Sequence, residues 1–146
     1  MPSEPSDLLD VNVWLALMDV DHVHHERARR YWQEESRPRV GFCRVSMLGL
    51  LRLATNPTVM RGQAFTPEEA WRAYRQFRAL PEVLFLHEPA ELETQMAAWS
   101  ERSDFPARRW TDCYLAALAS VSACRLVSFD RDYLQFPGLD FLHLAP

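Results

Sequence analysis

The sequence contains no lysine, so all 16 of its positively charged residues are arginine. Arginine binds phosphate groups bidentately, but biased codon usage in a GC-rich genome explains the absence of lysine at least as well. The net charge of -4 excludes a general electrostatic attraction to nucleic acid. A protein of this charge would need a local basic surface in order to bind RNA or DNA.

Long hydrophobic runs are also lacking. No segment approaches the ~18 consecutive apolar residues that span a bilayer, and the first residues lack the pattern of a secretory signal. We therefore expect a cytoplasmic protein without a membrane segment. Cysteine is scarce as well, since Cys43, Cys113 and Cys124 form an odd number without metal-ligand spacing. This pattern predicts small buried thiols in a reducing compartment.

The chain has the length of one domain. Its 146 residues are 48% hydrophobic, which suffices for one buried core, and no linker, repeat or low-complexity segment interrupts them. We expect residues 1–6 to form a frayed polar tail and residues 7–146 to form a single domain.

Segments of strand character alternate with segments of helical character. Strands are predicted at residues 8–11, 39–43, 83–86, 125–129 and 141–144. Helices are predicted between them, at residues 13–18, 21–34, 46–54, 66–79, 89–101 and 112–123. Ser46, Thr66 and Thr111 are the predicted caps of three of these helices. The alternation favours an α/β fold with a parallel sheet that is covered on both faces.

Three aspartates lie where such a sheet would bind a ligand. Asp10 and Asp130 each follow a predicted strand, and Asp112 lies in the first turn of a helix. Ligands of open parallel sheets bind beyond the carboxyl ends of the strands. Taken singly, each aspartate is better explained as a helix-dipole partner or a turn residue. Together they would repel one another unless a cation were bound, and hard oxygen ligands suit Mg²⁺ or Mn²⁺.

Around these aspartates the sequence resembles the PIN domain family, and specifically its VapC toxins. The likeness covers essentially the whole chain, in order, and the two C-terminal motifs are the specific ones. The segments that carry it are Leu-Leu-Asp-Val-Asn-Val at 8–13, the histidine-rich stretch 21–25, Leu-Leu-Arg-Leu-Ala-Thr-Asn-Pro at 50–57, Thr-Asp-Cys-Tyr-Leu-Ala-Ala-Leu-Ala at 111–119 and Ser-Phe-Asp-Arg-Asp-Tyr at 128–133.

The resemblance implies a PIN-like three-layer α/β/α sandwich with a short, mostly parallel sheet. It also implies a metal-dependent endoribonuclease, the toxin of a type II toxin–antitoxin system, that hydrolyses RNA phosphodiester bonds with water activated by Mg²⁺, for which Mn²⁺ can substitute. A cognate VapB-type antitoxin would block the site, and the protein would form a homodimer.

The resemblance also assigns roles to individual residues. Asp10, Asp112 and Asp130 would be the catalytic residues and the magnesium ligands. Asn12 and Thr111 would orient the first two of these aspartates from behind.

One position departs from the family pattern. Many PIN nucleases carry a glutamate on the helix before the Leu-Leu-Arg segment, and Gly49 occupies that position here. The departure leaves open whether one or two metal ions bind. It also supports an alternative, a catalytically inactive PIN-like module that binds RNA or protein. Asp132 is a weaker candidate ligand, better explained as a solvated turn residue.

Other features of the sequence give weaker indications of function. Arg108 and Arg109 are candidates for binding an RNA phosphate at the rim of the site, although a solvated loop explains them equally well. The cluster of His22, His24 and His25 is better explained by surface or dimer contacts than by a metal site, because His24 would point away from the other two on a helix. A phosphatase with Asp10 as nucleophile is disfavoured, since that chemistry usually requires a second acid two residues later.

Overall fold

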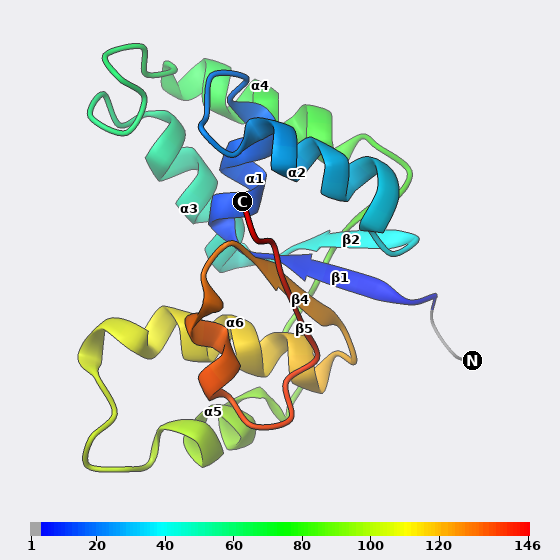
Figure 1. Cartoon of the computed structure of the whole chain (residues 1–146), viewed down its shortest axis with the longest axis vertical. Coiled ribbons are helices and arrows are strands. Elements are labelled where there is room, and N and C mark those ends of the chain that lie inside the picture. The colour runs from blue at the N-terminus through cyan, green and yellow to red at the C-terminus, as the bar shows by residue number, and fades with distance from the viewer. Residues whose placement is uncertain (1–3) are drawn as a thin grey trace.

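The computed structural model describes residues 4–146, which form a single five-stranded sheet between two layers of helices (Figure 1). All pairs of neighbouring strands are parallel, in the order β3-β2-β1-β4-β5. The predicted α/β/α sandwich is thus confirmed, with a sheet that is entirely parallel. The strands are β1 Ser6–Leu9, β2 Arg39–Phe42, β3 Val83–Phe85, β4 Arg125–Ser128 and β5 Phe141–His143.

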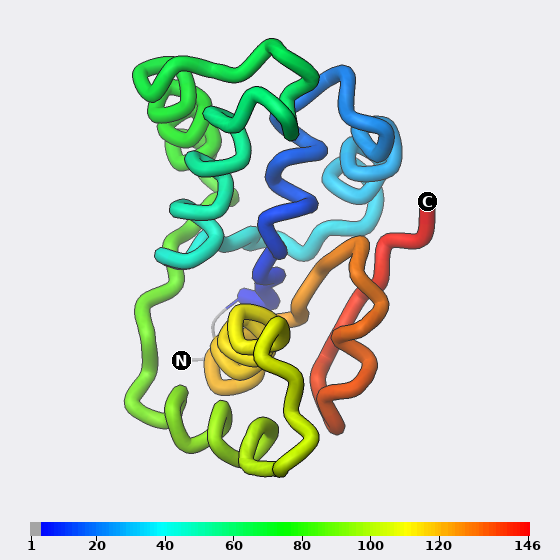
Figure 2. The backbone as a smooth tube through the Cα atoms, turned by 90° about the vertical axis from the view of Figure 1, so that its left-hand side faces the viewer, coloured from blue at the N-terminus to red at the C-terminus, as the bar shows by residue number. Residues whose placement is uncertain are grey.

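The helices divide between the two faces of the sheet. Helices α1 to α4 cover one face, and α5 and α6 pack side by side on the other (Figures 1 and 2). The α-helices are α1 Val11–Met18, α2 His25–Arg30, α3 Arg44–Ala54, α4 Pro67–Arg78, α5 Leu92–Ser100 and α6 Trp110–Val121. Shorter turns of helix lie at η1 Tyr31–Glu35, η2 Ala107–Arg109 and η3 Arg131–Gln135.

The central strands feed two separate cores because successive side chains of a strand point to opposite faces. Leu8 of β1 and Leu126 of β4 are buried against α5 and α6. Their neighbours Leu9 and Val127 are buried in the second core, under α1, α3 and α4. The two apolar layers fix the register of β1 against β4, and so fix which residues leave the sheet at its carboxyl edge.

The helix starts test the predicted caps. Thr66 is a cap as predicted, since its hydroxyl accepts a hydrogen bond from the Glu69 amide while the Glu69 carboxylate accepts one from the Thr66 amide. The prediction for Ser46 was wrong. Helix α3 begins at Arg44, three residues earlier than a cap at Ser46 would allow. Cys43 occupies the cap position, and the Ser46 hydroxyl accepts a hydrogen bond from the Cys43 amide.

The prediction that Thr111 caps a helix was also wrong. Helix α6 begins at Trp110, directly after η2, and Arg109 occupies the cap position without a side-chain cap. Other boundaries shift by a few residues. Strand β1 includes Ser6, one residue of the predicted tail, whereas residues 1–3 of that tail lie outside the described residues. Helix α2 begins at His25 and not near residue 21, because the Asp19 carboxylate binds the Asp21 amide in a turn.

The prediction of buried thiols is confirmed for Cys43, Cys113 and Cys124, which are free and buried. Over residues 4–146, no helix has both the length and the apolar character needed to cross a membrane.

Candidate metal-binding site

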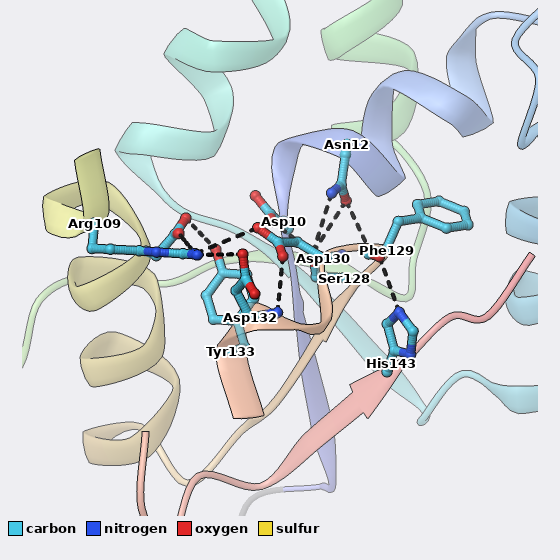
Figure 3. A network of polar contacts seen from close by, with 10 residues as sticks. Asp10, Asn12, Arg109, Ser128, Phe129, Asp130, Asp132, Tyr133 and His143 are labelled. Carbon is cyan, nitrogen blue, oxygen red and sulfur yellow. Dashed lines mark hydrogen bonds and ion pairs between the residues drawn. The ribbon is translucent and has the colours of Figure 1, made fainter. Parts of the chain in front are cut away.

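Asp10 lies where β1 passes into α1, at the carboxyl edge of the sheet (Figure 3). Its backbone amide donates to the Val127 carbonyl of β4 at 2.9 Å. Its carboxylate caps α1 by accepting from the Val11 amide at 2.7 Å, and accepts from the Ser128 hydroxyl, also at 2.7 Å. The side chain is therefore fixed between the ends of two neighbouring strands.

The surroundings of Asp10 disfavour its charge. Burial raises the pKa of the Asp10 carboxyl above its usual value, and repulsion from Asp112 adds to the increase, although the bonds from Ser128 and Val11 oppose it. Burial likewise raises the pKa of the nearby Tyr133 hydroxyl, with further contributions from Asp10 and Asp112. Tyr133 therefore stays protonated and acts as a hydrogen-bond donor in this site.

Asp112 and Asp130 reach the same edge from other elements. Asp112 projects from the first turn of α6 and accepts a hydrogen bond from the Tyr133 hydroxyl at 3.2 Å. Asp130 follows β4 and caps η3, where its carboxylate accepts from the Asp132 amide at 2.9 Å. The Asp130 amide donates to the Ser128 hydroxyl oxygen at 2.9 Å. The structure thus brings the three predicted aspartates to one edge of the sheet.

Arg109 lies among these acids and not at the rim. It donates to Asp112 Oδ2 at 2.9 Å through Nη1 and to Asp132 through Nη2, and its Nη1 lies 3.7 Å from Asp130 Oδ2 (Figure 3). The hydrogen bond from Arg109 Nη2 holds the pKa of the Asp132 carboxyl below its usual range. Asp132, considered a solvated turn residue from the sequence, is therefore part of the cluster. Arg108, in contrast, is exposed.

Asn12 fixes the loop after β4 and, through it, Asp10. The Asn12 amide group donates to the Ser128 hydroxyl oxygen at 3.2 Å, and its carbonyl accepts from the Phe129 amide at 3.4 Å. The same loop is held from β5, where His143 Nε2 lies 3.0 Å from the Phe129 carbonyl. Ser128 therefore connects Asn12 to Asp10. The sequence offered one signal for Ser128, a lone hydroxyl in an apolar strand that ends at an aspartate.

Thr111 does not share in this network. Its side chain is exposed, and no hydrogen bond from it to the aspartates is found over residues 4–146. Tyr133, which sequence reasoning missed as a site residue, provides the contact to Asp112 instead. The sequence offered one signal for Tyr133. It lies three residues after Asp130, and residues three apart lie on the same side of a short helix.

Gly49 of α3 is buried against the residue that follows Asp10. A Cβ atom on Gly49 would lie 2.6 Å from Cγ2 of Val11 and 3.1 Å from its Cγ1, which is closer than carbon atoms pack. The side chain of Val11 thus fills the space that any larger residue at position 49 would need. The packing of Val11 against position 49 thus leaves no room for the glutamate that many PIN nucleases carry there.

The donor set suits a hard divalent cation, since it consists of carboxylate oxygens with hydroxyl groups beside them. Within residues 4–146, however, no group of three acidic, histidine or cysteine side chains is close enough to hold a metal ion as the side chains stand. In this arrangement Asp112, Asp130 and Asp132 contact the guanidinium of Arg109.

The histidines at positions 22, 24 and 25 make packing contacts within the chain. The ring of His24 stacks on that of Phe129, with centroids 4.6 Å apart, and His25 Nδ1 lies 2.7 Å from the Ala16 carbonyl. Burial lowers the pKa of His22. The His24 contact packs the turn before α2 against the loop after β4. Because α2 begins at His25, the helical spacing that was expected to separate the three histidines does not apply to His22 and His24.

Comparison with known proteins identifies similar sequences. The model of the PIN domain family matches residues 8–139. Ribonuclease VapC41 of Mycobacterium tuberculosis is 37% identical over 143 residues, which cover 94% of this chain and 98% of that protein. Ribonuclease VapC39 of the same organism is 33% identical over 84% of this chain and 87% of its own length.

Solved structures show the same fold at lower identity. VapC20 of Mycobacterium tuberculosis, a sarcin-ricin loop cleaving toxin, gives a TM-score of 0.67 at 22% identity, over 91% of this chain and 95% of its own. VapBC2 of Rickettsia felis, bound to a fragment of promoter DNA, gives 0.68 at 10% identity, over 96% of this chain and 99% of the matched chain. At these identities the likeness concerns the fold alone.

Proposed function

The chain belongs to the PIN domain family, in the group of the VapC proteins, and from this premise we propose that it is an endoribonuclease that hydrolyses RNA phosphodiester bonds. The observation that carries the proposal is the meeting of Asp10, Asp112 and Asp130, from three different elements, at the carboxyl edge of the sheet. The ribonuclease names of its relatives supply the substrate class. The proposal treats residues 7–146 as one PIN domain.

In this proposal Asp10, Asp112 and Asp130 are both the catalytic residues and the ligands of Mg²⁺, for which Mn²⁺ can substitute. A divalent cation bound there polarises water and the scissile phosphate and balances the charge that develops on it. Ser128 and Asn12 hold Asp10 in place through their hydrogen bonds. Thr111 is retained as an orienting residue on the family resemblance alone.

A site with Gly49 instead of glutamate is proposed to hold one ion tightly. Glycine at this position gives α3 no carboxylate there, and Val11 occupies the space that a larger side chain would need. A second ion would then depend on oxygens from the RNA, which Mg²⁺ readily accepts as ligands. The exposed Arg108 would contact an RNA phosphate at the rim.

The proposed setting is that of a toxin in a type II toxin–antitoxin system. The support is the likeness to VapC proteins and to VapBC complexes. A VapB-type antitoxin would block the acidic site, the toxin would form a homodimer, and it would act on RNA in the cytoplasm. Expression alone is expected to arrest growth of a related host, and coexpression of the small partner to relieve the arrest. Undiminished growth with accumulated folded protein would contradict the toxin assignment.

Purified protein tests the nuclease itself. We expect cleavage of RNA in Mg²⁺ or Mn²⁺, no cleavage in chelator, and a loss of at least about 100-fold for Asp112→Asn, because one ligand is replaced by a neutral amide. Thermal melting of the variant provides the control for folding. Cleavage by Asp112→Asn at the wild-type rate would contradict the three-aspartate site. Absence of cleavage by wild type, with RNA still bound, would favour the inactive PIN-like module.

A further inference from the structure

Arg109 is a buried arginine between exposed neighbours. Only 8% of its surface is exposed, whereas Arg108 and Trp110 on either side are both exposed. Its side chain runs from the end of η2 into the aspartate cluster (Figure 3). Burial of an arginine is costly unless acids compensate its charge, so this side chain is held in place by what it contacts.

Both terminal nitrogens of Arg109 are engaged by carboxylates. Nη1 donates to Asp112 Oδ2 at 2.9 Å and lies 3.7 Å from Asp130 Oδ2. Nη2 donates to Asp132. While the guanidinium stays there, neither nitrogen is free to bind an RNA phosphate, as a substrate-binding role would require.

The oxygens that Arg109 contacts are those that a cation would need. Coordination of Mg²⁺ requires ligand oxygens at about 2.0–2.1 Å from one point. Asp112 Oδ2 and Asp130 Oδ2 instead point at a single nitrogen, at distances suited to a guanidinium. As the side chains stand, no three potential ligands among residues 4–146 are arranged for a metal ion.

We propose that Arg109 is an internal competitor of the divalent cation, which binds only when Nη1 withdraws from Asp112 and Asp130. The inference rests on the proposed function, because it takes these aspartates as metal ligands. The three carboxylates of Asp112, Asp130 and Asp132 surround the guanidinium, which supplies one unit of positive charge where a divalent ion supplies two. The ion therefore displaces Arg109 at a cost in apparent affinity.

Asp132 can hold the displaced side chain of Arg109 by accepting its hydrogen bond. It is exposed, it lies on η3 outside the proposed ligand set, and it accepts from Nη2. With Nη2 still held, Nη1 alone is released at the edge of the site. Arg109 then has a free donor where an RNA phosphate would approach, so the same residue serves the carboxylates before metal binding and the substrate after it.

The test is a titration of the full chain with MnCl₂ by calorimetry, without RNA, on wild type, Arg109→Gln and Arg108→Gln. Arg108→Gln is the matched control, because it removes the same charge from the adjacent, exposed position. We expect Arg109→Gln to bind Mn²⁺ about tenfold more tightly than wild type. Arg108→Gln is expected to stay within about twofold, since solvent screens an exposed charge.

A second readout separates competition from a merely structural role. In chelator, Arg109→Gln is expected to melt below wild type, because Asp112, Asp130 and Asp132 lose the guanidinium that compensates their charge. A lower metal-free melting temperature together with tighter Mn²⁺ binding is the result that competition alone produces. A residue that only shaped the site would weaken Mn²⁺ binding when removed, so equal or weaker binding by folded Arg109→Gln overturns the inference.

Arg109→Lys covers the case in which Arg109→Gln does not fold. It keeps the charge but cannot bridge two acids with a planar fork, and we expect Mn²⁺ to bind about threefold more tightly than to wild type. No gain in this variant overturns the inference. If wild type cleaves RNA and neither variant gains affinity, the inference alone fails. If no protein binds Mn²⁺ and wild type does not cleave RNA, the proposed function fails and the inference with it.

Discussion

The two ends of β1 each carry an aspartate, and the two carboxylates have opposite charge environments. Asp7, at the amino end, is fully buried and accepts from the Arg125 guanidinium at 2.8 and 3.0 Å, from the Tyr31 hydroxyl and from the Arg37 amide. At the carboxyl end, Asp10 is repelled by Asp112, which shares the guanidinium of Arg109 with Asp130 and Asp132.

The difference separates a structural network from a binding site. Around Asp7 one carboxylate meets two arginines, since Arg37 Nε also lies 3.8 Å away, and the donors around it satisfy its oxygens. Around Asp10 the negative charge is in excess, which lowers the stability of the folded protein. Such an excess is characteristic of a site completed by a bound cation.

The largest effect on stability is expected at the amino end. Asp7→Asn should lower the free energy of unfolding by about 3 kcal/mol, because it leaves the largely buried Arg125 without its charge partner. Asp140→Asn is the control, since this exposed partner of Arg37 should contribute less than about 1 kcal/mol. Urea unfolding measures both. Equal losses in the two variants would show that the Asp7 network is not structural.

A smaller effect on stability is expected at Gly49, where the side chain of Val11 leaves no room for an acidic residue. Gly49→Ala should cost about 1–3 kcal/mol by overpacking against Val11, although alanine favours helix by about 1 kcal/mol. Val11→Ala in the same chain should remove most of that cost, and the double-mutant cycle measures the coupling. Gly49→Glu should therefore fold well only together with Val11→Ala. Additive effects in the cycle would contradict this explanation.

The smallest effect is expected at Asp10, with the opposite sign to Asp7. In chelator at pH 7, Asp10→Asn should stabilise the protein by about 1 kcal/mol, because the raised pKa of Asp10 means that its charged form is disfavoured in the folded state. This advantage should shrink as the pH falls through the raised pKa toward the usual value of 3.8, where wild type becomes protonated as well. Melting curves across this range test it; destabilisation at pH 7 would contradict the contrast with Asp7.

Much of the fold was predictable because its signals are local. The alternation of strand and helix patterns predicted the α/β sandwich, and the spacing from Thr66 to Glu69 predicted a capping box within one turn. The resemblance to the PIN domain family is confirmed by the family match over residues 8–139. The caps at Ser46 and Thr111 were wrong because neighbouring residues compete for the cap position, and packing decides between them.

The placement of Asp10 and Asp130 at one edge also followed from the sequence, because parallel strands end at the same side of a sheet. Their role in metal binding stays a prediction. The contacts between distant segments were decided only by the tertiary structure. Ser128 binds Asp10 across 118 positions of the chain, and Arg109 reaches Asp132 across 23. No local pattern specifies such pairs, because they depend on how α6, η3 and β1 pack around a shared core.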